Sequence, residues 1–313
     1  MRIGIVVDSA CDLPSDWLDA AGVVLLPVTV RIGEAELVDL RDEQATLEFA
    51  QAHLAERGHT AETSAFPAER IKALFLERLV IDYDYVFCLT VTRNRSRIHE
   101  NATQASFAIL NEYKQVRSAA GHGTPFALRV VDSQQVFAGQ GLLPVEAVRL
   151  REAGAGAPDI RTRLDFLATR SYTYMVPRDL GYLRARTRHR GDRSVSLLAA
   201  TLGGALDIKP ILHCHQGETG PVARVRGFDH AARTLFRFVE ERVEDGLLTP
   251  TLCLSYGGPL EALRALPGHD RLMEVCRAHN IEVFEAVMGL SGMVNVGAGA
   301  LTVGFAAPPH AFA

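Results

Sequence analysis

The sequence predicts an α/β protein of two domains, the first built on a mostly parallel sheet with flanking helices and the second on a mixed sheet with helices. Short buried apolar runs alternate with helix-length segments, which is the pattern of βαβ units. The chain has 313 residues, of which 48% are hydrophobic, and this is enough for two cores. The stretch Gly154-Ala155-Gly156-Ala157-Pro158 breaks the alternation, so we expect domains over residues 1–156 and 157–313.

The N-terminal half begins with an apolar run at residues 3–7, which predicts a strand. Asp12-Leu13-Pro14 then predicts a helix start, because Asp caps helices and proline fits the first turn. The other elements expected in this half are strands over 23–32, 85–91 and 126–131, a hairpin return over 33–40, a polar, proline-terminated loop over 63–67, and helices over 42–57, 68–79, 96–117 and 141–151.

The C-terminal half continues the alternation. We expect helices over 159–168, 178–183, 194–206 and 228–243, strands over 172–176, 251–256, 282–286 and 300–305, and a β-hairpin over 208–225. Residues 287–306 carry no charged side chain, and their hydropathy resembles that of a membrane span. Five glycines among them favour a buried glycine-rich loop followed by a strand.

The charge balance argues against a nucleic-acid partner. The formal net charge is −4, so we expect no nucleic acid and at most a transient contact with a membrane surface. The densest basic run, residues 184–193, holds five arginines and no interleaved aromatic side chain. This run is either a solvated surface loop, or a segment that docks an acidic partner or contributes one arginine to a ligand.

The cysteines and the N-terminus predict a cytoplasmic protein. Five widely spaced cysteines, without a C-x-x-C pair, suit reduced thiols better than a disulfide framework or a structural zinc site. The first residues run directly into the first strand without the apolar core of a signal peptide.

Hydroxyl and carboxyl side chains follow or precede the predicted elements at several points where ligands bind in α/β sheets. Ligands bind beyond the carboxyl ends of parallel strands, where helix N-termini offer free N–H groups. The residues at such points are Asp8, Ser9, Thr63, Ser64, Thr92, Ser96, Asp132 and Ser133. A single serine or threonine there is usually only a helix cap. Several together favour an oxygen ligand such as a carboxylate.

Sequence motifs for catalysis or metal binding are missing. The chain has no G-x-S-x-G elbow, no phosphate loop, no H-E-x-x-H and no dinucleotide fingerprint in its required context. In a strand, His213 and His215 would face one side and Cys214 the other, so we expect no metal site there. His99 and Glu100 are expected on a solvated helix face. We therefore predict no catalytic residues.

Several motifs in sequence order resemble those of the DegV family. Residues 8–14, DSACDLP, are similar to its DSxxDLP opening. The other similar segments are Thr63-Ser64 with Pro67 (TSQPS), residues 91–102 (ISSxLSGTYQSA), Asp132-Ser133 (IDS), Tyr182-Leu183 followed by 203–212 (YLxxGGR, GSLLNIKPIL) and 289–300 (GPVIGTHTGPGA). The likeness extends over nearly the whole chain.

This resemblance implies a fatty-acid carrier. It implies a long-chain fatty acid between the two domains, with its carboxyl group bound at Thr63, Ser64 and Ser96 and its tail in an apolar tunnel. It also implies a partner, a separate ATP-binding kinase that resembles dihydroxyacetone kinase and converts the bound carboxyl group to an acyl phosphate. The chain itself would then need no cofactor and no catalytic residue.

Three places depart from the family pattern at the expected headgroup site. Asn295 stands where the family has a histidine, and Arg97 replaces the glycine after the motif serine. Arg186-Thr187 stand where the family has paired glycines before its arginine, which leaves Arg188 as the residue aligned with that arginine. Either Arg97 or Arg188 compensates for the histidine, or the ligand or kinase partnership differs. The alternative function is an acyl hydrolase or transferase using Ser96, which needs a base within hydrogen-bond reach of that serine.

Overall fold

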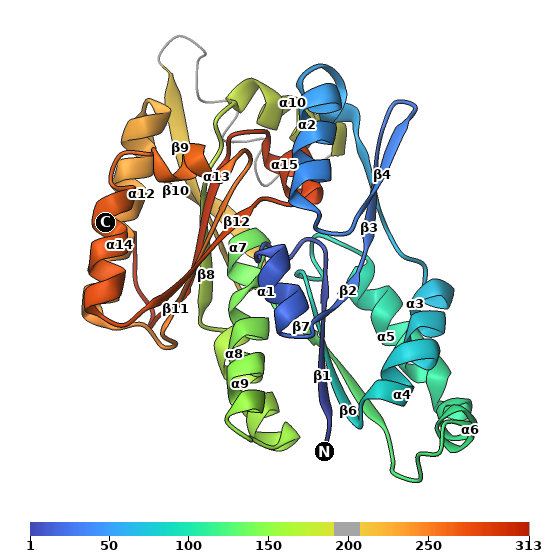
Figure 1. The fold of residues 1–313 in the computed structure, drawn as a ribbon. Coiled ribbons are helices and arrows are strands. Elements are labelled where there is room, and N and C mark those ends of the chain that lie inside the picture. The colour runs from blue at the N-terminus through green and yellow to red at the C-terminus, as the bar shows by residue number, and fades with distance from the viewer. Residues whose placement is uncertain (191–206, 313) are drawn as a thin grey trace.

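The computed structural model describes residues 1–190 and 207–312 (Figure 1). The N-terminal half contains a parallel sheet in the order β2-β1-β6-β7. Its strands are β1 (Ile3–Asp8), β2 (Val24–Leu26), β6 (Tyr85–Thr90) and β7 (Ala127–Asp132). Both faces of this sheet are covered, which explains why its central strands, β1 and β6, are mostly apolar in the sequence.

A separate antiparallel sheet, in the order β4-β3-β5, lies beside the parallel one. It consists of β3 (Val28–Ile32), β4 (Ala35–Asp39) and β5 (Glu62–Ala65). The single strand predicted over 23–32 is therefore wrong, because the chain passes from one sheet to the other at Pro27, which has no N–H to donate. The loop predicted over 63–67 is wrong as well, since its first residues pair with β3.

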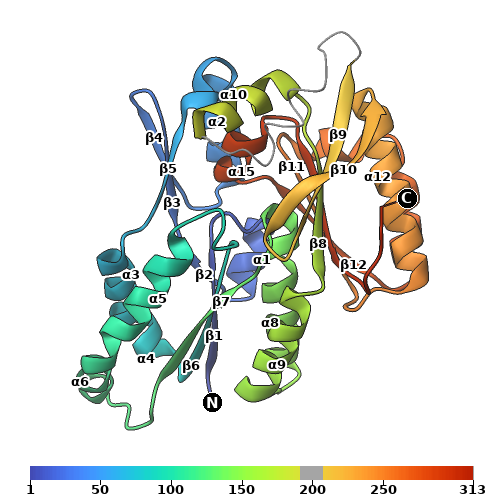
Figure 2. The same cartoon turned by 180° about the vertical axis from the view of Figure 1, so that it is seen from behind.

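Helices cover both faces of the parallel sheet. Helices α3 and α5 lie on one side, and α8 and α9 lie on the other (Figures 1 and 2). The helices of this half are α1 (Ser15–Ala20), α2 (Glu43–Arg57), α3 (Ala68–Leu74), α4 (Val80–Asp82), α5 (Ile98–Ala108), α6 (Tyr113–Ala119), α7 (Phe137–Gln140) and α8 (Leu142–Glu152). A π-helical turn at Phe75–Leu79 joins α3 to α4, so the predicted helix over 68–79 is interrupted.

The C-terminal half contains a six-stranded mixed sheet in the order β10-β9-β8-β13-β11-β12. Its strands are β8 (Ser171–Val176), β9 (Ile208–His215), β10 (Glu218–Arg226), β11 (Thr251–Tyr256), β12 (Glu282–Val287) and β13 (Leu301–Ala306). The predicted hairpin is confirmed, because β9 and β10 pair antiparallel. The mixed character is also confirmed, since β11 pairs parallel to β12 and antiparallel to β13.

The helices of this half are α9 (Ala157–Ala168), α10 (Leu180–Arg190), α12 (Phe228–Asp245), α13 (Leu260–Arg264), α14 (His269–Ala278) and α15 (Leu290–Val296). Helices α12 and α14 cover the outer face of the mixed sheet. The basic run, for which a solvated surface loop was one of the alternatives, is helical as far as Arg190. The helix predicted over 194–206 lies outside the described residues. The glycine-rich segment predicted as a loop contains α15.

The two halves meet through close backbone contact and buried polar bonds. All strands up to β7 precede residue 156, and all strands from β8 follow it, while α9 packs on α8 across this position. Helix α7 lies against the mixed sheet, where a Cβ atom on Gly304 would come within 2.5 Å of Gly139 N. No described helix is long and apolar enough to cross a membrane.

Candidate functional site

A cavity lies between the two halves of the protein and is lined by both. Its volume of about 140 Å³ is roughly ten times what a single water molecule requires. The N-terminal half contributes residues from the ends of β1 and β6, from β3 and β5, and from the segment before α7. The C-terminal half contributes residues from β8, β9, β10, α10 and α15. This is the edge where the carboxyl ends of the parallel strands lie, as expected for a ligand site.

Much of the cavity wall is apolar. Val28, Val136 and Phe137 from the N-terminal half face Met175 and Leu212 from the mixed sheet. All five side chains are buried. Such a wall binds hydrocarbon by removing it from water, at about 25 cal/mol per Å² of buried apolar surface.

Two hydroxyl groups mark the mouth of the cavity. Thr63 on β5 and Ser96 before α5 line the cavity and also an open cleft outside it, which we call the outer cleft. The Ser96 hydroxyl accepts a hydrogen bond at 3.2 Å from the N–H of Ile98, the first residue of α5. Hydroxyls at the junction of a closed cavity and an open cleft suit an oxygen-bearing headgroup at the mouth.

Two arginines that sequence reasoning did not select also line the cavity. The guanidinium of Arg95 donates to the Thr219 hydroxyl on β10. Arg186 on α10 is buried, with 3% of its surface exposed, and donates to Ala61 O at 2.5 Å. Its Nε and Nη2 each lie 3.4 Å from Asn295 Oδ1 on α15. In the sequence, Arg186 stood out only as a member of the basic run and as a departure from a family glycine.

The predicted site residues therefore fall in three places. Thr63, Ser96 and Asn295 line the cavity. Ser64 and Arg97 line only the outer cleft, and the Arg97 side chain is 80% exposed beside Glu100. Arg188 is exposed on α10 and is absent from the cavity lining.

Residues of the opening motif, 8–14, lie both at the cavity and at the contact between the two halves. Asp8 lines the cavity, and its carboxylate accepts bonds from Val91 N (2.6 Å), Ala10 N (3.0 Å) and Gln140 Nε2 (3.2 Å). Complete burial raises the pKa of Asp8 to about 6. The Ser9 hydroxyl accepts from Val28 N at 2.9 Å, which fixes the crossing from β2 to β3.

Asp12 joins the two halves. Its Oδ1 lies 3.1 Å from Arg41 Nη1 and accepts from Gly289 N at 2.8 Å, while its Oδ2 accepts from the Ser255 hydroxyl at 2.6 Å. Arg41 also donates to Val287 O at 2.9 Å. Burial raises the pKa of Asp12, and the adjacent Arg41 guanidinium opposes that shift. The motif thus has a structural role at this position.

The hydrogen-bond partners of Ser96 bear on the hydrolase alternative. Among the described residues, no histidine or carboxylate is hydrogen-bonded to the Ser96 hydroxyl. His99 Nδ1 instead lies 3.0 Å from the Thr90 hydroxyl. Desolvation lowers the pKa of His99.

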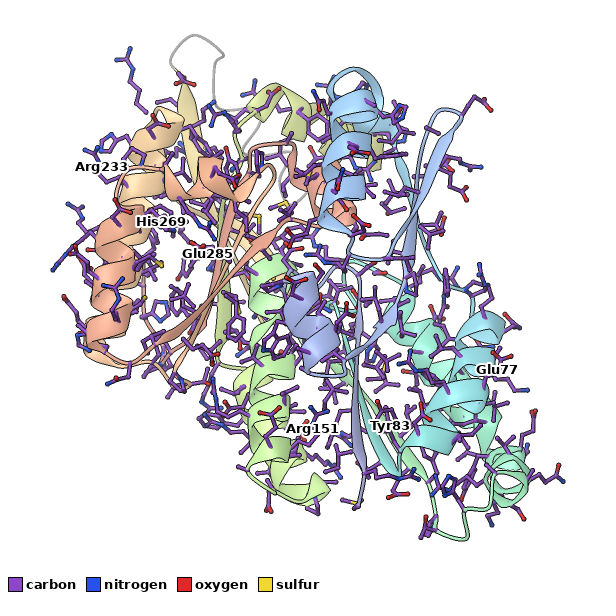
Figure 3. The ribbon with its side chains drawn as sticks, viewed as in Figure 1. Glu77, Tyr83, Arg151, Arg233, His269 and Glu285 are labelled. Atoms are coloured by element: carbon purple, nitrogen blue, oxygen red, sulfur yellow. The ribbon has the colours of Figure 1, made fainter. Side chains whose placement is uncertain are left out.

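Other polar clusters serve packing in the C-terminal half. His269 Nε2 on α14 lies 2.6 Å from Glu285 on β12 (Figure 3), which also accepts from Arg264 at 2.8 Å. The hydrogen bond from His269 and the nearby Arg264 lower the pKa of Glu285. In the part of the chain that the structure describes, no three His, Cys, Asp or Glu side chains are grouped to hold a metal ion.

Comparison with known proteins identifies the family. A family model described as an uncharacterised protein of the DegV family matches residues 2–307. A DegV domain-containing protein of Xanthomonas axonopodis pv. citri is 60% identical over 312 residues, which cover 100% of this chain and 99% of the relative. The chain belongs to the DegV family. The family assignment made from the motifs is confirmed.

Solved DegV structures share the fold. DegV from Bacillus subtilis, described as a fatty acid binding protein, matches with a TM-score of 0.77 at 19% identity, covering 98% of this chain and 100% of that one. A protein from Eubacterium ventriosum, described as binding stearic acid, matches with a TM-score of 0.76 at 20% identity, covering 97% and 98% of the two chains. The predicted fold of two α/β domains is thereby confirmed.

Proposed function

We propose that this DegV protein is a carrier that binds a long-chain fatty acid in the cavity between its halves. The observation that carries the proposal is an apolar cavity with two hydroxyls, Thr63 and Ser96, at its mouth. Two solved DegV proteins with this fold are described as binding fatty acids, which supports the same class of ligand here.

The distribution of polar and apolar groups favours a carrier for amphipathic molecules. Each buried methylene contributes about 0.8 kcal/mol, so the acyl chain would supply most of the binding free energy. The hydroxyls would orient the carboxyl group toward the outer cleft, where a second protein can reach it. Asn295, which also lines the cavity, completes the polar end.

The proposal includes a kinase partner. The DegV resemblance implies a separate ATP-binding protein, similar to dihydroxyacetone kinase, that phosphorylates the presented carboxyl group. Supporting this division of labour, no histidine or carboxylate of the described residues is hydrogen-bonded to the Ser96 hydroxyl. The carrier would act without a cofactor of its own and would be non-catalytic by itself.

Mass spectrometry of the purified protein tests the carrier function. Native spectra should show a stoichiometric adduct, and denaturation with organic extraction should release a fatty acid. A Thr63→Val, Ser96→Ala double variant should be depleted of it, since both headgroup hydroxyls are lost. Arg97→Ala should keep full occupancy, because Arg97 is exposed outside the cavity.

Two outcomes would reject the proposal. A protein that is empty as purified and does not take up added fatty acids is not a fatty-acid carrier. Turnover of an acyl ester by the wild type, lost in Ser96→Ala, would favour the hydrolase or transferase instead.

A further inference from the structure

We propose that Arg186 is the cation that pairs with the carboxylate of the bound ligand and so selects an acid over a neutral lipid. The inference rests on the proposed carrier function and names a specificity residue that the family motifs do not. Arg186 occupies the position of a family glycine, two residues before the aligned Arg188.

The first argument is position. Arg186 lines the cavity together with Thr63 and Asn295, and 3% of its surface is exposed. Its Nη1 donates to Ala61 O at 2.5 Å, and Ala61 is two residues before Thr63. The guanidinium is therefore held at the same end of the cavity as the threonine hydroxyl. Arg188 lies on the exposed part of α10 and does not line the cavity.

The second argument is orientation by Asn295. Asn295 Nδ2 donates to Ser291 O at 2.7 Å, one turn earlier in α15, so its Oδ1 faces Arg186. Nε and Nη2 of Arg186 each lie 3.4 Å from that oxygen. An amide oxygen orients the guanidinium and adds no negative charge of its own. Asn295 is thus a positioning residue for Arg186.

The third argument is the anchoring of α10. The Tyr182 hydroxyl donates to Val294 O at 2.8 Å, which fixes α10 to α15 one turn before Arg186. The Thr187 hydroxyl bonds to Leu183 O at 3.0 Å within the helix. The planar guanidinium is consequently preorganised, and its fork matches a carboxylate better than an alcohol or ester.

Among the described residues, two other charged side chains, Asp8 and Arg95, line the same cavity and could affect the binding of a carboxylate. Asp8 is bonded to two backbone N–H groups and Gln140. Arg95 donates to Thr219 and lies at the mouth, where the cavity joins the outer cleft. Arg95 is therefore the alternative cation that an experiment must separate from Arg186.

The test compares palmitate with hexadecanol, which have the same chain length but an ionised and a neutral headgroup. Affinities are measured on delipidated full-length protein by displacement of a fluorescent fatty-acid probe. Arg186→Gln should weaken palmitate about 10- to 100-fold, the range for one lost hydrogen bond to a charged group. Hexadecanol affinity should stay within about twofold, and it reports for each variant that the cavity is intact.

Matched variants complete the test. Arg186→Lys keeps the charge and should retain part of the preference for palmitate, while Arg188→Gln should retain all of it. Asn295→Ala should lower the ratio of palmitate to hexadecanol affinity without lowering the affinity for hexadecanol. If Asn295 had only a structural role, its loss would weaken the binding of both molecules. If Arg186→Gln leaves the ratio of palmitate to hexadecanol affinity unchanged, the role of Arg186 is rejected. It is also rejected if Arg95→Gln or Arg188→Gln abolishes the preference for palmitate instead. Neither result rejects the carrier function. A wild type that binds no palmitate rejects the carrier function itself.

Discussion

Asp8 has no exposed surface, yet its carboxylate stands at the end of β1 with three hydrogen-bond donors around it. The donors favour the ionised form, but desolvation is the larger effect and raises the pKa to about 6. The folded protein therefore holds this proton more tightly than the unfolded chain, in which the pKa is near 3.8. The contribution of Asp8 to the free energy of unfolding is largest at pH values below its pKa in the unfolded chain. This contribution is lost as the pH rises through the pKa of Asp8 in the folded protein.

The first prediction concerns this pH dependence. Relative to Asp8→Asn, which stays neutral, the wild type should lose on the order of 3 kcal/mol of unfolding free energy between about pH 4 and pH 7. Urea unfolding of both proteins at several pH values measures the difference. Subtracting the unfolding free energy of the variant from that of the wild type at each pH cancels the contribution of all other titrating groups. A difference that does not change with pH would contradict the raised pKa.

Ionised or neutral, Asp8 is already committed to bonds with Ala10, Val91 and Gln140. Asp8 is therefore better explained as part of the cavity wall than as a residue that binds the ligand. The hydroxyls of Thr63 and Ser96 have fewer competing partners and remain the residues proposed to meet a headgroup.

At the scale of elements, β5 decides which hydroxyl can meet a ligand. Side chains alternate across a strand, and here Thr63 is half-buried at the cavity while Ser64 is exposed in the outer cleft. Neighbours in sequence thus face different environments. This separation could not be read from the sequence, because the segment was predicted as a loop.

The second prediction uses that alternation. Thr63→Val keeps the shape of the side chain but removes its hydroxyl, and should weaken fatty-acid binding about 10- to 100-fold. Ser64→Ala should leave the affinity unchanged within about twofold, because its hydroxyl lies outside the cavity. Titration calorimetry on delipidated protein measures both variants. Equal effects of the two substitutions would show that the strand does not orient the headgroup site.

The elements that sequence reasoning missed share a physical cause. β5 is an edge strand with polar residues, and its pairing with β3 brings together residues 31 and 62, far apart in the chain. Helix α15 contains Gly292, a poor helix former, but a Cβ atom there would come within 2.6 Å of Met288 Cγ, so tertiary packing requires a small residue. The two central strands of the parallel sheet, β1 and β6, were predicted well because packing on both faces makes them mostly apolar.

The same limit explains why the sequence selected Arg188 and missed Arg186. Residues two apart on a helix point about 200° away from each other, so only one of the two can face the cavity. That choice depends on the rotation of α10, which the contact between Tyr182 and Val294 sets. The sequence did not predict a helix over this segment, so it could not indicate which arginine faces the cavity. Ser96 could be selected from the sequence because it lies between the end of β6 and the start of α5. Thr63 was selected as a residue before a helix, although it lies within β5.

At the scale of the whole molecule, the cavity exists only where the two halves meet. The joint includes the close approach of Gly139 to Gly304 and the buried bonds between Asp12, Arg41 and the segment from Val287 to Gly289. The opening motif of the family is thus placed where it sets the relative position of the cavity walls. A substitution there should act on stability and on ligand binding together.

The third prediction tests this joint. Arg41→Leu removes one partner of a buried ion pair, in which the two side chains are 3% and 1% exposed, and strands the Asp12 carboxylate. Such a loss costs about 3–5 kcal/mol of unfolding free energy. Arg78→Leu is the matched control, because its ion pair with Asp82 is exposed and should change stability by no more than about 0.5 kcal/mol. Guanidinium unfolding followed by far-UV circular dichroism measures both.

If Arg41→Leu cost less than about 1 kcal/mol, the Asp12–Arg41 pair would not hold the halves together, and their packing alone would set the shape of the cavity.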